Sequence, residues 1–378
     1  MQRKLQYQGI DCAIVLQSKA LFYYTGTAQN AHLIVPSQGD PLLLVKKDFG
    51  RAREETDLQN VRQLESIKKL PDIVNDHCRT PARIGLEMDV LPAKNYLYYQ
   101  RLFDGAELVD VSGLIRAQRI VKSVAEVNII RESAARQLEV YRQIPDILRE
   151  GMAEIELAAE VEAKARKLGH YGITPLRGFN LAIFYGHIMS GENGAVPSSF
   201  EGPTGGKGLG PAMPQSAGLR KIRAHEPVIV DYTGCYNGYI VDMTRVYSIG
   251  SLPETLVKAH RVAVDIQDMI AEKARPGMSC EKLYFQALDY AEKAGLKRYF
   301  LGYNYTLPFV GHGVGLELNE LPLLARGYDQ PLVDSSVIAI EPKFLFPGQG
   351  AVGIENTFLV TEHGLEKLTA SNDEIIVI

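Results

Sequence analysis

Four acidic residues interrupt apolar, strand-like sequence in the C-terminal half of the chain, and they occur as two pairs. Asp231 and Asp242 lie on either side of Asn237-Gly238, a dipeptide typical of a two-residue β-hairpin turn. A turn there puts the two aspartates nearly opposite each other, offset by about one residue pair. Two buried carboxylates so close together are costly to ionise unless a cation lies between them. The first pair therefore indicates a hairpin that binds a cation.

The second pair repeats this arrangement. Glu341 and Glu355 are equidistant from Gly348, which lies in the predicted connecting loop, and each lies in strand-like sequence. His312 adds an imidazole, and its neighbouring glycines let the backbone approach a cluster closely. A lone aspartate in a strand is more often an edge residue, and a glycine-flanked histidine is more often a loop residue. The two matched pairs favour a hard, oxygen-rich site for two divalent cations.

Strand-like runs alternate with helical stretches over the first ~120 residues. The runs are CAIVLQ, AHLIVPS, PLLLVKK and ARIGLEMD, and the turn-forming Gly39-Asp40-Pro41 joins the second to the third. This alternation is typical of a small α/β domain. We find no cluster of catalytic residue types in it.

A domain boundary is expected near Arg119 to Ser123. Ser123-Val124-Ala125-Glu126 is a capping box, and it opens an amphipathic helix that we expect to continue until Gly151. A second helix follows and ends at Gly169.

The same order of elements then returns. After the first hairpin come a helix that starts at Pro253, a helix capped by Ser279, and the second hairpin. Helix, helix and hairpin therefore occur twice. This weak structural repeat predicts an α+β C-terminal domain with pseudo-twofold symmetry and a site between its halves.

Composition excludes several classes of function. A chain of 378 residues suggests two domains, at roughly 100–200 residues each. Its formal net charge of -4 and its lack of a long basic run argue against nucleic-acid binding. We expect no secretory signal, no membrane span and a cytoplasmic location, because no apolar stretch is long enough. The scattered cysteines, without a CxxC pair, fit reduced thiols and argue against a thiolate zinc site. They are Cys12, Cys78, Cys235 and Cys280.

Four segments together resemble the pita-bread metallopeptidases, which include methionine aminopeptidase, aminopeptidase P, prolidase and creatinase. VDYTGCYNGYIVDMTR is similar to the paired-aspartate segment of this family, and GHGVGLELNE to its histidine segment. AIEPKF and GIENTFLVTE are similar to its two glutamate segments. The resemblance implies a pita-bread catalytic domain over residues 121–378. More loosely, residues 1–120 resemble the creatinase-type N-terminal α/β domain.

The resemblance implies a dinuclear centre. Asp231 would chelate one metal ion, and Asp242 and Glu355 would bridge both. His312 and Glu341 would complete the shell of the other ion. A bridging water, acidified by both ions, would be the nucleophile, and Glu341 would pass its proton toward the leaving nitrogen. The ions would be manganese, cobalt, iron or zinc, among which the ligands do not choose. A homodimer is likewise expected from the resemblance.

Several positions depart from the prolidase-like pattern. Histidines that help to bind substrate and stabilise the tetrahedral intermediate are replaced, so the metal cradle is complete but its surroundings differ. The departures are Pro197-Ser198-Ser199, Pro308 and Asn319 in place of histidines, Lys343 in place of the glycine of EPG, Gly353 in place of an arginine, and Asn356 in place of an aspartate.

Other residues could supply the missing functions. Asn319 could donate a hydrogen bond to an oxyanion. His187 could reach the site from the loop before it, although an ordinary buried or loop histidine is the competing interpretation. Lys343 could neutralise charge near the second hairpin, although a solvated lysine at a strand end is more common. Catalytic roles are therefore predicted for Glu341, His187 and Asn319.

Three functions remain open. The favoured one is hydrolysis of an amide bond in Xaa-Pro dipeptides or short peptides, as in a prolidase. The second is a non-peptide metal enzyme of the same fold, a C–N hydrolase similar to creatinase or ectoine hydrolase, or a lyase, which acts on a small metabolite. The third is a binding scaffold without catalysis, which the presence of all five ligands disfavours.

Overall fold

The computed structural model describes every residue, Met1–Ile378, and divides into two compact units. Met1–Arg119 forms the first unit, together with the short segment Gly178–Asn180. Ile120–Arg177 and Leu181–Ile378 form the second. The boundary predicted after residue 120 adjoins the point where the units divide. No helix is both long and apolar enough to cross a membrane.

The first unit is built on a six-stranded mixed sheet with the order β4-β3-β2-β1-β5-β6. β1 pairs in parallel with β5 but antiparallel with β2. The four predicted runs form β1, β2, β3 and β5, and the Gly39-Asp40-Pro41 turn joins β2 to β3, as predicted. The strands are β1 (Cys12–Val15), β2 (Ala31–Pro36), β3 (Leu42–Val45), β4 (Val61–Gln63), β5 (Arg83–Leu86) and β6 (Glu107–Asp110).

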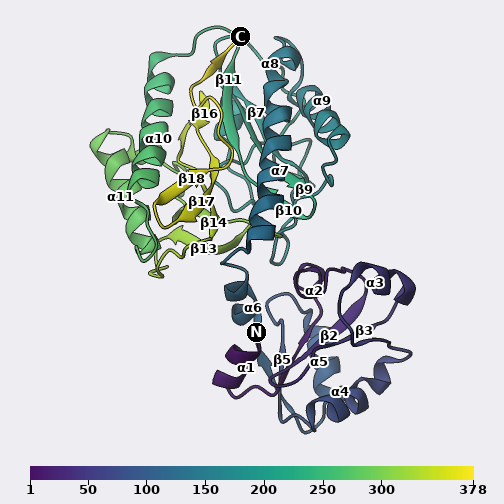
Figure 1. Cartoon of the computed structure of the whole chain (residues 1–378). Helices are drawn as coiled ribbons and strands as arrows, with labels where there is room; N and C mark the ends of the chain where they lie inside the picture. The colour runs from purple at the N-terminus through teal and green to yellow at the C-terminus, as the bar shows by residue number, and fades with distance from the viewer. The chain divides into compact units, whose positions relative to one another are not determined.

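Helices pack on both faces of this sheet (Figure 1). Successive side chains of β1 alternate between the faces: Ala13 and Val15 pack toward α1, α2, α3 and α6, whereas Cys12 and Ile14 pack toward α4 and α5. This period of two explains why the strand is apolar throughout. The helices are α1 (Gln2–Tyr7), α2 (Ser18–Thr25), α3 (Phe49–Glu55), α4 (Leu70–Cys78), α5 (Ala93–Leu102) and α6 (Ser112–Gln118).

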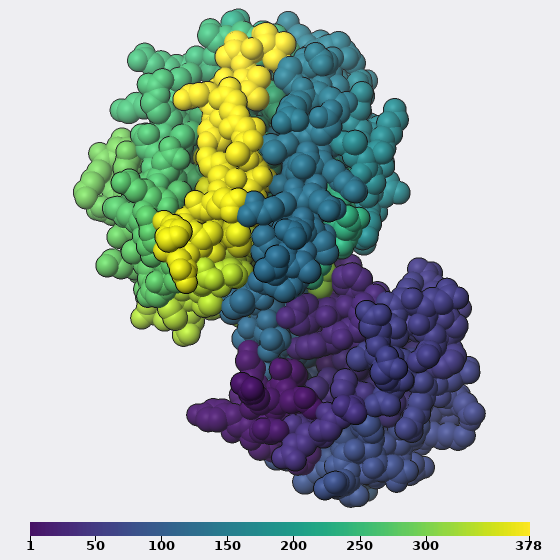
Figure 2. Space-filling view, viewed as in Figure 1, coloured from purple at the N-terminus to yellow at the C-terminus, as the bar shows by residue number.

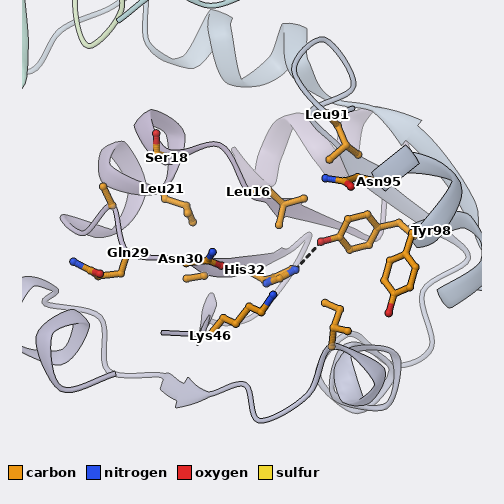
Figure 3. A pocket seen from close by; sticks show the side chains of 14 residues that line it. Leu16, Ser18, Leu21, Gln29, Asn30, His32, Lys46, Leu91, Asn95 and Tyr98 are labelled. Carbon is orange, nitrogen blue, oxygen red and sulfur yellow. Dashed lines mark hydrogen bonds between the residues drawn. The ribbon is translucent and has the colours of Figure 1, made fainter. Parts of the chain in front are cut away.

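The first unit also contains a cavity of about 520 Å³ (Figure 3). His32 lies in its wall, and the His32 Nε2 is hydrogen bonded to the Tyr99 hydroxyl at 2.7 Å. Lys46 and Asn95 also line it. None of the residues predicted to bind metal or to act in catalysis is among its lining residues.

In the second unit, two groups of helices flank the strands (Figure 1). α10 and α11 enclose one apolar core with the sheet β13-β12-β14-β17-β18 and the hairpin β15-β16. α7, α8 and α9 enclose the other core with the sheet β19-β11-β8-β7. Helix, helix and strands thus occur twice along the chain, as the sequence predicted. The space-filling view shows the C-terminal segment lying between the two groups (Figure 2).

The helices of this unit are α7 (Val124–Arg142), α8 (Ile144–Ile147), α9 (Glu154–Lys167), α10 (Glu254–Lys273) and α11 (Cys280–Lys293). The strands of the first half are β7 (Gly186–Ser190), β8 (Val228–Tyr232), β9 (Gly234–Tyr236), β10 (Tyr239–Val241) and β11 (Thr244–Ser248). Those of the second half are β12 (Phe309–Gly313), β13 (Glu320–Ala325), β14 (Val337–Ile340), β15 (Lys343–Phe346), β16 (Gly350–Gly353), β17 (Asn356–Thr361), β18 (Gly364–Lys367) and β19 (Ile376–Val377).

One predicted helix is shorter than expected. The capping box at Ser123 and Glu126 is present, but α7 ends at Arg142 and the short α8 follows. Pro145 lies in the first turn of α8, where its missing N–H costs nothing, whereas within a continuous helix it would remove a hydrogen bond. The prediction of one helix up to Gly151 was therefore wrong.

Candidate metal centre

The first acidic pair is positioned by a tight turn. Asn237 and Gly238 have φ values of 51° and 87°, and they close the hairpin of β9 and β10. The same register continues outward, so that Asp231 in β8 pairs with Thr244 in β11. Asp242 follows β10 directly and is offset from that pair along the strand. The two aspartates are therefore arranged as the turn predicted.

The two residues of the second acidic pair, Glu341 and Glu355, lie opposite each other on neighbouring strand segments. β14 and β17 pair Ile340 with Asn356, and β15 and β16 pair Lys343 with Gly353. Glu341 and Glu355 lie between these two sets of pairs, opposite each other. An isolated bridge between Thr244 and Glu355 connects the two hairpins, and the Thr244 hydroxyl donates to Glu355 Oε2 at 2.9 Å.

His312 turns one ring nitrogen toward these acids. Its Nδ1 lies 3.2 Å from the backbone oxygen of Gly313. Because that oxygen can only accept, a hydrogen bond between the two requires a proton on Nδ1. The Nε2 then presents a lone pair, the form in which histidine binds metal. This Nε2 lies 3.5 Å from Glu341 Oε1 and 3.9 Å from both Asp242 Oδ2 and Glu355 Oε1.

A divalent cation fits this part of the centre. Asp242, His312 and Glu355 each offer a ligand atom, and these atoms lie within 4.8 Å of one another. Glu355 Oε1 is buried and has no hydrogen-bond partner, which is costly unless a cation binds there. Burial, followed by the charge of Asp231, raises the pKa of Asp242 to about 7, and burial and the charge of Asp242 raise the pKa of Glu355 well above its ordinary value. A bound cation would favour the ionised form of both carboxyls.

The ammonium group of Lys343 occupies the other part of the acidic cluster. The ammonium group of Lys343 lies 2.8 Å from Glu355 Oε2, 2.9 Å from Asp231 Oδ2 and 3.0 Å from Glu341 Oε2. Its side chain is only 1% exposed. Burial opposes the charge, yet the three carboxylates hold the pKa of Lys343 well above its ordinary value. The interpretation of Lys343 as a solvated strand-end residue was therefore wrong, because the side chain points into the acidic cluster.

His187 is connected to Asp231 through the hydroxyl of Thr204. In β7 it pairs with Asp231, and its Nδ1 lies 3.0 Å from the Thr204 hydroxyl, which in turn donates to Asp231 Oδ2 at 2.9 Å. Burial lowers the pKa of His187 to about 4, so the ring is neutral. Burial would raise the pKa of Asp231, but the charge of Lys343 and the hydrogen bonds from Lys343 and Thr204 hold that pKa below its usual range. The structure thus brings His187 to the centre, behind Asp231.

Asn319 has a different set of contacts. Its Oδ1 accepts from the backbone N–H of Arg177, and its Nδ2 donates to the backbone oxygen of Arg177, both at 2.8 Å. Both ends of the amide therefore hold a backbone segment. These contacts speak against the predicted hydrogen bond from Asn319 to an oxyanion.

Two residues that the sequence did not indicate support the centre. The buried guanidinium of Arg245 donates to the backbone oxygens of Thr244 and Glu355, at 2.8 and 3.0 Å, and to Asn356 Oδ1 at 2.8 Å. The only signal for it was a charged residue inside strand-like sequence. Thr204, which binds Asp231, lies in a glycine-rich segment and carried no signal.

Family models match both units of the chain. Residues 128–362 match the model of metallopeptidase family M24, and residues 1–121 match that of the creatinase/prolidase N-terminal domain. An uncharacterised peptidase of Bacillus subtilis is 27% identical over 98% of this chain and 96% of its own length. The Xaa-Pro dipeptidase of Pyrococcus furiosus is 26% identical, over 97% of this chain and 95% of its own length.

Solved structures show the same fold. The Xaa-Pro dipeptidase from Bacillus anthracis superposes with a TM-score of 0.86 at 23% identity, and the alignment covers 100% of this chain and 98% of that one. The prolidase from Pyrococcus horikoshii superposes with a TM-score of 0.84 at 24% identity, covering 99% and 98%. The chain therefore belongs to metallopeptidase family M24, a family of peptidase hydrolases, and carries a creatinase/prolidase N-terminal domain before its catalytic domain.

Proposed function

We propose that this protein is a divalent-metal-dependent hydrolase that cleaves an amide bond in a short peptide, with Xaa-Pro dipeptides as its substrate class. The observation that carries the proposal is the convergence of Asp242, Glu355 and the Nε2 of His312, with Glu355 Oε1 buried and without a hydrogen-bond partner. Membership of family M24 supports hydrolysis, and relatives named Xaa-Pro dipeptidase support the substrate class.

A divalent ion bound by these residues would polarise a carbonyl oxygen and make water a nucleophile at neutral pH. The remaining steps fall to the protein's own groups. Glu341 directs Oε1 toward the His312 Nε2 and accepts a hydrogen bond from Lys343 at Oε2. Its carboxylate is therefore positioned to accept a proton within the centre and to return it to the leaving nitrogen. Burial of these groups strengthens each of these electrostatic interactions.

Two other residues act through their neighbours. His187 orients Thr204, which donates to Asp231, so we assign His187 a positioning role. Asn319 fixes the backbone of Arg177 from both sides, and we assign it a positioning role as well.

The test is turnover by the purified protein after reconstitution with manganese or cobalt. A mass-spectrometric panel holds Xaa-Pro dipeptides, longer Xaa-Pro peptides, creatine and ectoine-type amides, with Asp242→Ala as the blank. We expect cleavage of Xaa-Pro dipeptides by the wild type and none by the variant. A fully loaded protein that leaves every Xaa-Pro bond intact would exclude this substrate class.

A second candidate function is hydrolysis of a small non-peptide amide. One observation favours it: the Lys343 ammonium lies among carboxylates of the centre. The ammonium group changes the charge that a substrate meets in this centre. A centre in which metal ions are the only cations would present a different charge. Cleavage of creatine or an ectoine-type amide, in the absence of Xaa-Pro cleavage, would support this alternative.

A further inference from the structure

Lys343 is bound as an internal cation. Its Nζ donates to Asp231, Glu341 and Glu355, each from a different strand or strand end, at 2.8–3.0 Å. An ammonium group has three N–H donors and no acceptor. Each donor is therefore used, and each contact is charge-assisted, which makes it stronger than a hydrogen bond between neutral groups.

A metal ion at the same point would need different distances. Divalent transition metals bind carboxylate oxygens at roughly 2.0–2.2 Å, well inside the 2.8–3.0 Å at which these oxygens surround Nζ. The ions of two-metal centres lie about 3.5–4 Å apart. An ion added next to Nζ would also face a positive charge in a buried setting, where electrostatic repulsion is poorly screened.

The fold makes room for this lysine at one position. Gly353 faces Lys343 across β15 and β16. A Cβ at Gly353 would lie 2.5 Å from the Pro342 backbone oxygen, 2.6 Å from Lys343 Cα and 2.8 Å from Lys343 Cγ. A side chain at residue 353 would therefore collide with the lysine stem and its backbone.

The backbone of Lys343 is also held in place. Its carbonyl oxygen accepts a hydrogen bond from Leu301 at 2.9 Å, and the neighbouring Phe344 bridges Phe300. The side chain is only 1% exposed. The ammonium is thus a fixed part of the centre.

From these contacts we propose that Lys343 permanently replaces one of the two metal ions, so that each chain binds a single divalent ion at Asp242, His312 and Glu355, with Glu341 beside it. The inference concerns metal binding and does not depend on the substrate. Its failure is therefore distinguishable from failure of the proposed function, which is judged by turnover.

The number of metal ions per chain tests the proposal directly. The full-length protein is dialysed against excess Mn²⁺, gel-filtered, and analysed for metal and protein. Low-temperature electron paramagnetic resonance of the same samples separates isolated Mn²⁺ from magnetically coupled pairs. We expect one ion per wild-type chain and the spectrum of isolated Mn²⁺. Two ions per chain, a coupled spectrum, or no bound ion would overturn the proposal.

Variants identify the lysine as the cause. Lys343→Ala removes the ammonium and opens its space, so this variant should bind two ions per chain and give a coupled spectrum. The matched control is Lys122→Ala, which removes another buried lysine, paired with Glu320, and should still bind one ion. A folded Lys343→Ala that binds only one ion would contradict the exclusion by Lys343. If that variant does not fold, the wild-type stoichiometry and spectrum still decide.

Discussion

His312 shows how one side chain is prepared for its role before any ligand arrives. The hydrogen bond from Nδ1 to the Gly313 carbonyl fixes the ring, and Nε2 faces Asp242, Glu341 and Glu355. A proton on Nδ1 leaves Nε2 with the lone pair through which histidine binds metal. The same contact sets the ring plane, so the imidazole does not have to reorient when an ion binds.

The two aspartates should respond differently to loss of charge. Asp242 belongs to the cation-binding cluster, whereas Asp231 is already bound by Lys343 and Thr204. We expect Asp242→Asn to weaken Mn²⁺ affinity by more than about 100-fold and Asp231→Asn by about tenfold, which is typical of a residue behind the ligands. Titration calorimetry measures both, and circular dichroism checks that each variant is folded. Equal losses in the two variants would contradict this asymmetry.

His170 should make the fold sensitive to acid. Burial lowers its pKa from 6.5 to about 4, and the neutral ring accepts from the Gly172 N–H and contacts the Thr233 carbonyl. The unfolded chain takes up a proton below 6.5 that the folded chain resists until about 4, so the stability present above 6.5 is lost as the pH falls through this window.

Urea denaturation in the presence of a chelator measures this loss. Between near pH 7.5 and about pH 5, the wild type should lose roughly 2 kcal/mol more than His170→Gln. His363→Gln, a change on the surface, should keep the wild-type pH dependence. An unchanged pH dependence in His170→Gln would show that another group carries the effect.

The spacing of acids around two turns predicted that the four carboxylates lie close together, because strand register follows from the turn. His312 was predicted from its neighbouring glycines and from the family resemblance. The spacing did not predict that the Lys343 side chain points into the acidic cluster. That orientation depends on the absence of a side chain at Gly353, across from Lys343. Nor did it predict that Asn319 binds the Arg177 backbone, since those residues are distant in sequence and meet only in the folded chain.

At the level of elements, the hairpins determine the geometry of the centre. The turn at Asn237 and Gly238 sets the register that continues to Asp231 and Thr244. Thr244 then connects this hairpin to Glu355 on the second. An error in either turn would therefore displace carboxylates on both hairpins.

Gly238→Ala tests the first turn. Gly238 has a φ of 87°, where an L-residue with a Cβ is disfavoured by about 1–2 kcal/mol. We expect that loss in the free energy of unfolding, measured by urea titration. Asn237→Gly retains the turn conformation and should change stability much less. A neutral Gly238→Ala would mean that the hairpin tolerates another turn type.

Element types were predicted better than element ends. Caps and apolar periodicity identified α7, α9, α10 and α11, because these signals lie within each helix. The break between α7 and α8 at Pro145 was missed, since the apolar pattern continues across it.

The whole molecule consists of two units with separate apolar cores. The first unit packs its own helices on both faces of a mixed sheet, and the second encloses the acidic cluster between two groups of strands. Because each unit has an apolar core of its own, each has the means to unfold as one cooperative unit.

In scanning calorimetry, metal binding should therefore raise the unfolding temperature of the second unit alone. A Mn²⁺ concentration of about 100 times Kd stabilises the folded form by about 2.7 kcal/mol. We expect the transition of the second unit to shift upward and that of the first unit to stay unchanged, while Asp242→Asn loses the shift. Equal upward shifts of both transitions would contradict separate unfolding.

The contact of Lys343 with Gly353 constrains the order in which this centre can change over generations. A Cβ at residue 353 would lie 2.5 Å from the Pro342 carbonyl oxygen and 2.6 Å from Lys343 Cα, as well as 2.8 Å from the lysine Cγ. A smaller residue at 343 removes only the last of these contacts, so a side chain at 353 also requires the backbone at Pro342 and Lys343 to shift. A lineage therefore leaves this state more readily through a change at residue 343 than through one at residue 353.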